Sequence, residues 1–135
     1  MFVAAAVALV QAVPAIEFAT LGDGPLVAEY RAAWPDELAA RRERGNAPDF
    51  RPPSRFARVG AEVFRRGGRT VPALLALLRA EATAPLPDPD DTHDLLAWHV
   101  LEVLVAVGDP RAVPAALQVA DGLGCVDELT RAGWQ

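Results

Sequence analysis

The 135-residue sequence contains a single cysteine, Cys125, and only two histidines, His93 and His99. One cysteine excludes a disulfide within the chain and is typical of proteins that work in a reducing compartment. One cysteine and two histidines are also too few to build a cysteine-rich zinc site. We therefore expect a cytoplasmic protein without a structural metal ion.

Lysine is absent, and all thirteen basic residues are arginine. This bias indicates a GC-rich bacterial genome, an inference from composition alone. The formal net charge is -5. A dedicated nucleic-acid-binding domain is expected to be basic, so the overall charge argues against that class.

Hairpin and membrane-span patterns are lacking as well. The dipeptide Asp-Gly often forms the turn of a β-hairpin, but Asp23-Gly24 does not separate two alternating strands. Pro25 follows it, which indicates a loop. The apolar N-terminal run ends at Gln11, too short to cross a bilayer, and no positive charge precedes Arg31, as a secretory signal would require. We expect residues 2–12 to form a buried terminal helix, which a partner or a second copy of the chain can also cover.

The clearest element present is an apolar helix, a tight turn and a second apolar helix between Asp94 and Gly122. Within the turn, Gly108 suits the left-handed conformation that ends a helix. Asp109 can cap the next helix through its side-chain oxygen, and proline fits the first helical turn that follows. The first helix is apolar on nearly every side, so it is predicted to be the most buried, with Trp98 in the core.

Parts of this element recur along the chain. The tripeptide Val-Pro-Ala opens a predicted helix at Val113, at Val71 and at Val13. A helix and a glycine turn, from Arg55 to Gly68, precede Val71 in the same way that a helix and a glycine turn precede Val113. The step between these two copies is 42 residues. Two-helix HEAT and armadillo units have a period of roughly 40–47 residues.

The sequence Gly108-Asp109-Pro110-Arg111-Ala112-Val113-Pro114-Ala115 resembles the inter-helix signature of HEAT repeats, most closely the short bacterial phycobilin-lyase type. Residues 69–75 resemble a partial second copy, with two glycines in place of Gly-Asp-Pro. The copy at Val13 lacks the glycine turn. The resemblance implies an all-α, right-handed HEAT-like helical-repeat stack of two to three helix pairs with an extra inserted helix. It also implies a concave face lined by the helices at 72–82 and 114–120. An ordinary helical bundle with similar turns is the alternative.

We expect one domain over residues 1–135, with the inserted helix and loop at 34–53. A helix over 14–21 is predicted to end at residues 21–25, and a short helix is predicted over 26–33. A new helix is then predicted to begin at Pro35, because proline suits a first turn and two carboxylates follow it.

The next helices follow an amphipathic pattern. Ser54 is predicted to cap a helix whose inner stripe contains Phe56, Val59, Val63 and Phe64. Its outer face is expected to carry Arg55, Arg58, Glu62 and Arg65. Further along, the apolar helix that precedes Gly108 is expected to be capped by Asp91 or Thr92, with Asp94 in its first turn.

Charge is distributed unevenly along the chain. Between Arg41 and Arg69 the sequence contains nine arginines and three acidic residues. From Glu81 onward it contains ten acidic residues and two arginines. Five of the arginines are predicted to form a ridge along one helix and at its two ends: Arg51, Arg55, Arg58, Arg65 and Arg69. Such a ridge suits an acidic protein segment or phosphates. The alternative is a solvated face balanced by the acidic C-terminal half.

No pattern of residues indicates catalysis. The acidic run from Asp88 to Asp94 lacks the glycine and the distal glutamate of an EF-hand calcium loop. His93 and His99 leave a helix in different directions, and His99 is expected to make a surface pair with Glu102. Cys125 has no adjacent basic residue that would activate a thiol. We therefore predict no catalytic, cofactor-binding or metal-binding residue.

These observations favour a non-catalytic binding or scaffold module that holds another protein, with the arginine ridge as the candidate contact for an acidic segment. Nucleic-acid binding through the same ridge is the first alternative. A HEAT-like lyase or glycosylase is the second, although no acid–base pair supports it. Self-association through the apolar N-terminal helix is a further possibility, and no membrane contact is expected.

Overall fold

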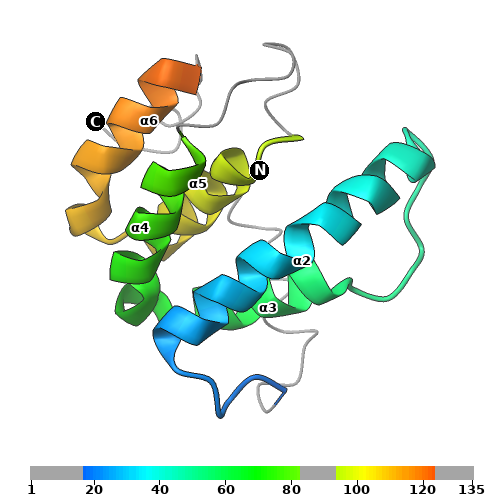
Figure 1. The fold of residues 1–135 in the computed structure, drawn as a ribbon, viewed down its shortest axis with the longest axis horizontal. Coiled ribbons are helices and arrows are strands. Elements are labelled where there is room, and N and C mark those ends of the chain that lie inside the picture. Colours follow the sequence, from blue (N-terminus) through cyan, green and yellow to red (C-terminus); the bar gives the residue numbers. More distant parts are fainter. Residues whose placement is uncertain (1–16, 83–93, 124–135) are drawn as a thin grey trace.

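The computed structural model describes residues 17–82 and 94–123, and these residues form helices without any strand (Figure 1). The predicted all-α class is therefore confirmed. The elements are α2 (Asp23–Arg44), α3 (Arg55–Arg66), the 3-10 helix η1 (Gly67–Thr70), α4 (Val71–Glu81), α5 (Leu96–Val107), the 3-10 helix η3 (Pro110–Ala112) and α6 (Val113–Leu123). Within the described ranges, no helix is both long and apolar enough to cross a membrane.

Several predictions concern residues outside the described ranges. They are the helix over 2–12 and the first residues of the helix over 14–21, the caps Asp91 and Thr92, and the side chains His93 and Cys125.

Helix α2 is one continuous element of 22 residues, so the prediction of a short helix over 26–33 and a new helix from Pro35 is wrong. Residues 21–25 start α2 rather than ending an earlier helix, because Gly22 is its N-cap and its carbonyl accepts from Leu26 N at 2.9 Å. Proline is tolerated inside the helix because Trp34, beside it, is buried and anchors this part of α2 to the core. Gly45 ends α2 with a positive φ of 58°.

Helix α3 follows the predicted amphipathic pattern, with one exception. The Ser54 hydroxyl caps the helix by accepting from Ala57 N at 3.2 Å, and Phe56, Val59 and Val63 are buried. Glu62, however, is only 4% exposed and does not lie on a solvated outer face. Its carboxylate is buried because two arginines of the following turn fold back onto it.

Helix α5 is the most enclosed element of the described chain, as predicted, and Trp98 is 3% exposed. The helix begins at Leu96, so the expectation that Asp94 lies in its first turn is wrong. Its N-cap, Leu95, contributes no side-chain hydrogen bond. His99 is also buried at 6% exposure, and its ring lies 4.8 Å from that of Trp34 on α2. The expected pair with Glu102 is present, with His99 Nδ1 3.9 Å from Glu102 Oε1, but His99 lies in the core rather than on the surface.

The turn after α5 has the predicted chemistry. Gly108 ends α5 in the left-handed region at φ 72° and ψ 22°. The Asp109 side chain accepts from Arg111 N at 2.9 Å and so caps η3, which leads directly into α6. Asp109 also accepts from the Arg111 guanidinium, which in turn donates to the Gly68 carbonyl at 2.9 Å.

Replacing Asp109 by alanine is expected to lower the melting temperature of the domain by about 4 °C, the typical effect of losing a helix cap in a domain of this size. The pKa of Asp109 is held below its ordinary value by hydrogen bonds from Arg111, so the cap is ionised at neutral pH. Thermal unfolding followed by circular dichroism would measure the change. Asp121→Ala, at an exposed site on α6, is the matched control. An unchanged melting temperature in Asp109→Ala would contradict the cap.

The helices pack largely on their neighbours in the chain. Helix α2 packs most extensively on α3, and α4 on α5, while α3 also contacts α5 and joins the two halves of the core. Figure 1 shows α2 crossing in front of α3, with α4, α5 and α6 grouped beside them. The loop between α2 and α3 consequently lies at the opposite side of the molecule from α6.

Candidate functional site

Each arginine of the predicted ridge has a carboxylate partner within the chain. Arg55 donates to Glu29 at 2.8 Å, Arg58 to Glu17 at 3.1 Å, and Arg69 to Asp23 at 3.3 Å. Arg51 and Arg65 have the partners Asp49 and Glu62 respectively. The structure therefore places these five side chains along α3 and its ends, but each of them is already paired.

The partners of the ridge come from the N-terminal and middle parts of the chain. Within the described ranges, none of the carboxylates paired with these five arginines comes from the acidic C-terminal half that was expected to balance the ridge. Two other arginines do pair with residues from Glu81 onward: Arg31 with Glu81 at 2.8 Å, and Arg42 with Asp94 at 3.4 Å. Because a phosphate would have to compete with existing carboxylates, the ridge offers less net positive potential than its arginine count suggests.

Changing Arg55, Arg58 and Arg65 together to glutamine is expected to leave nucleic-acid affinity unchanged. We expect no DNA or RNA binding tighter than roughly 10 micromolar at physiological salt, given the net negative charge. Fluorescence anisotropy with single-stranded and duplex oligonucleotides would measure it. Submicromolar binding at that salt, abolished in the triple variant, would make nucleic acid the leading partner.

The loop between α2 and α3 is held in place by its own side chains. Asp49 accepts from the backbone N and the Nε of Arg51, both at 3.1 Å, and also from Arg44 at the end of α2. These bonds, chiefly those from Arg51, lower the pKa of Asp49 to about 2. Prolines precede and follow this pair at Pro48 and Pro52. The loop is thus fixed both by backbone restriction and by charged hydrogen bonds.

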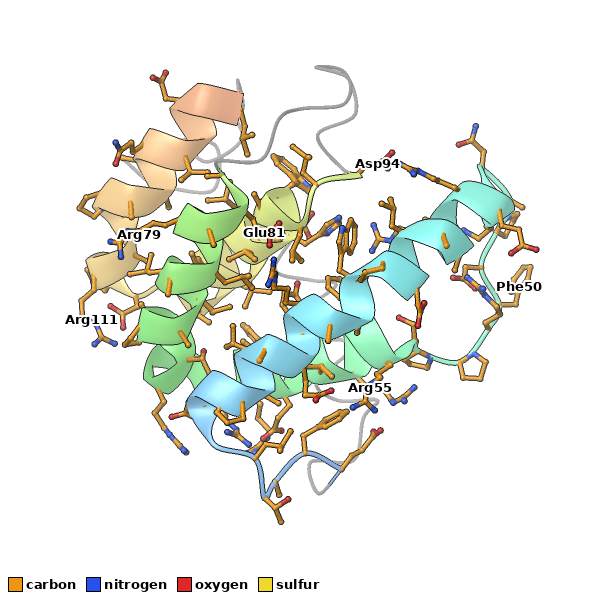
Figure 2. All side chains as sticks on the ribbon, in the orientation of Figure 1. Phe50, Arg55, Arg79, Glu81, Asp94 and Arg111 are labelled. Atoms are coloured by element: carbon orange, nitrogen blue, oxygen red, sulfur yellow. The ribbon has the colours of Figure 1, made fainter. Side chains whose placement is uncertain are left out.

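Phe50 lies between the two paired residues and is 92% exposed, and it is the one large apolar side chain that is exposed among residues 17–82 and 94–123. Figure 2 shows it on the loop at the edge of the molecule, away from the helical core. An exposed aromatic ring on a fixed loop loses little conformational freedom on binding, because the surrounding backbone is already ordered. Phe50 therefore has the properties of an interface anchor.

Two hollows lie beside the loop. One, of about 510 Å³, lies between the loop, the N-terminal turn of α3 and the face of α2 that carries Asp36. The other, of about 640 Å³, lies between the loop and the last turns of α2, and Phe50 is part of its lining. The two hollows share Ala40, Asp49 and Arg51. We call residues 45–54, together with the α2 residues that line these hollows, the loop surface.

The inner side of the loop surface is tied to the core. Burial of the Glu37 carboxylate raises its pKa, but hydrogen bonds from Arg41 and Ser54 outweigh burial and leave the pKa below its ordinary value. Arg41 also lies 5.6 Å above the Trp34 ring and 3.4 Å from His99 Nε2. Glu37 thus links α2 to Ser54 at the end of the loop, while Arg41 links α2 to Trp34 and His99 in the core.

The buried side of this cluster also contains Tyr30 and His99. Tyr30 stacks on Phe56 with ring centroids 4.4 Å apart, and burial raises the pKa of its hydroxyl far above its usual range. His99 is buried beside the rings of Trp34 and Phe56, and its ring nitrogens lie near polar side chains, Nε2 near Arg41 and Nδ1 near Glu102. In the part of the chain that the structure describes, no three histidine, cysteine or acidic side chains gather as metal ligands would.

The residue that sequence reasoning missed is Phe50. The available indication was one aromatic residue within a run of prolines and charged residues, NAPDFRPP. Of the five ridge arginines, Arg51 and Arg55 line the hollows beside the loop, whereas Arg58, Arg65 and Arg69 are not among the lining residues. Comparison with protein-family models, with curated proteins and with solved structures finds no match to this chain.

Proposed function

We propose that the domain is a non-catalytic binding module that holds a partner protein on the loop surface, with Phe50 as the anchor. The observation that carries this proposal is the 92% exposure of Phe50 on a loop fixed by the Asp49 hydrogen bonds. Isolated apolar side chains are common on protein surfaces. Here, however, the side chain is aromatic, the backbone is ordered and hollows adjoin it, which together favour docking.

We further propose that α3–α4 and α5–α6 are two HEAT-like repeats. In support, α3 and α5 have 12 residues each. Each pair is joined through a glycine of positive φ, Gly67 at 61° and Gly108 at 72°, and a 3-10 helix. Each second helix starts with Val-Pro-Ala.

The burial pattern supports the same proposal. Fully buried residues recur at steps of 41 and 42 positions, so the two helix pairs use equivalent positions to form the core. The recurring pairs are Val59 with Val100, Val63 with Leu104, Leu74 with Ala116, and Leu78 with Ala120. The two glycine turns are also in contact, through the bond from Arg111 to the Gly68 carbonyl. Contact between successive units is typical of helical-repeat proteins, which often serve as binding scaffolds.

The proposal is tested by quantitative affinity capture from cells of the source organism, with the intact chain as bait. We expect at least one protein whose recovery falls about tenfold or more when Phe50 is changed to alanine, as for an interface anchor. Gln118→Ala, at an exposed site on α6, is the matched control and should leave recovery unchanged. Equal recovery of every captured protein by wild type and Phe50→Ala would contradict the proposed docking surface.

A further inference from the structure

We infer that the segment docking on the loop surface is basic, with Lys or Arg side chains that meet Asp36 and Glu43 while an apolar socket of the partner receives Phe50. This inference rests on the proposed function and adds the chemistry of the partner. It favours a basic segment over the acidic segment predicted from the arginine content of the sequence.

The first observation is the position of the two carboxylates. Asp36 lines one hollow and Glu43 lines the other, with Ala40 common to both. These residues are spaced by four and three positions, so they form one stripe of α2. Both carboxylates are on exposed residues, and within the described ranges neither makes an ion pair. The stripe therefore presents acidic groups beside the exposed aromatic ring.

The second observation is that the guanidinium groups near the stripe are already paired. Arg41 donates to Glu37 at 2.9 Å, while Arg44 and Arg51 both donate to Asp49. Arg55, which also lines a hollow, is paired with Glu29. An acidic segment would have to compete with these intramolecular carboxylates, whereas a basic segment would find Asp36 and Glu43 without displacing any pair. Charge complementarity therefore favours a basic partner.

The spacing along α2 sets a further requirement on the partner. Asp36 and Glu43 are seven residues apart, which corresponds to about 10 Å along a helix axis. About three residues of extended chain cover the same distance. Because alternate residues of an extended segment face the same side, two basic side chains two or four residues apart, with an apolar residue near Phe50, would satisfy the whole surface.

The test uses a phage-displayed library of random dodecapeptides, selected on the intact chain and counter-selected on the Phe50→Ala variant. Enriched peptides are then synthesised, and their affinities are measured by fluorescence anisotropy. We expect enriched peptides to be net positive and to contain an apolar residue. Phe50→Ala should weaken them about tenfold or more. The double variant Asp36→Asn/Glu43→Gln should weaken them roughly fivefold, the effect of losing two exposed charge pairs. Raising the salt concentration should shrink that difference.

Asp121→Asn is the matched control, because it removes an exposed carboxylate of α6 that is remote from the loop, and it should leave affinity unchanged. Peptides that require Phe50 but are acidic or neutral, or that bind the double variant as well as wild type, would overturn the basic-segment inference and leave the docking surface intact. Failure to obtain any Phe50-dependent peptide would overturn the docking surface itself.

Discussion

Replacing Trp98 by alanine is expected to destabilise the domain by about 3–5 kcal/mol, the usual cost of removing a buried tryptophan. Trp98 is 3% exposed in α5, and both Leu101 and Leu104 of the same helix are also buried. Domains of this size are typically stable by only about 5–15 kcal/mol, so the variant should be partly unfolded at moderate temperature. Urea unfolding followed by far-ultraviolet circular dichroism would measure the loss.

The matched variant for this experiment is Trp98→Phe, which keeps an aromatic ring in the core and should lose much less stability. Trp98→Ala with near-native stability and a cooperative transition would show that α5 is not central to the fold. That result would also weaken the proposed two-repeat arrangement, because α5 contacts both α3 and α4.

Replacing Arg66 by methionine is expected to cost about 3 kcal/mol. The Arg66 side chain is only 4% exposed and donates to Glu62 at 3.1 Å and Asp23 at 3.0 Å, and also to the Phe18 carbonyl at 2.9 Å. It thereby ties the end of α3 to the start of α2. Removing one member of a buried ion pair is strongly destabilising because the other charge stays buried. Urea unfolding at neutral pH would measure the loss.

Two further measurements identify the source of that loss. Changing Glu62 to methionine in the Arg66→Met background should recover a large part of the stability, because both buried charges are then gone. The pKa of Glu62 is lowered, chiefly by the hydrogen bond from Arg65, with Arg66 adding to it and burial opposing it. Ionised Glu62 therefore stabilises the fold above its unfolded-state pKa of about 4.3, and this contribution disappears as the pH falls through the lowered pKa. If the stability lost in Arg66→Met does not become smaller at acidic pH, the ion pair with Glu62 is excluded as the cause of that loss.

The turn at Gly108-Asp109 and the helix starting at Arg55 could be predicted because their determinants are local. Gly108 takes a positive φ, Asp109 and Ser54 accept hydrogen bonds from the backbone two or three residues ahead, and the stripe of α3 follows the helical period. In each case the sequence carries the residue type and the backbone requirement within one helical turn.

The continuity of α2 could not be predicted in the same way. Residues 21–25 combine glycine, aspartate and proline, which suit a helix end as well as a helix start. Pro35 likewise suits a first turn, and its position inside a helix depends on tertiary contacts. Trp34, beside it, packs against Phe56 of α3 and His99 of α5, residues 22 and 65 positions away. No local pattern shows such contacts.

The loop surface was only partly foreseen, for a related reason. The sequence shows that residues 46–53 form a loop, but the exposure of Phe50 depends on what surrounds it in three dimensions. The arginine ridge shows the same limit, because Arg55 and Arg58 pair with carboxylates 26 and 41 residues away. Counting charges along the sequence finds the arginines but not the partners that neutralise them.

The packing of α2 on α3 and of α4 on α5 has a consequence for folding speed. Helix α2 packs on α3 and α4 packs on α5, so many of the contacts that form the core close short lengths of chain. Closing a short loop costs less chain entropy than closing a long one, and helical proteins rich in such contacts fold in microseconds to milliseconds. We therefore expect this chain to reach its native state within milliseconds, which leaves the transiently exposed core residues little time to engage other unfolded chains.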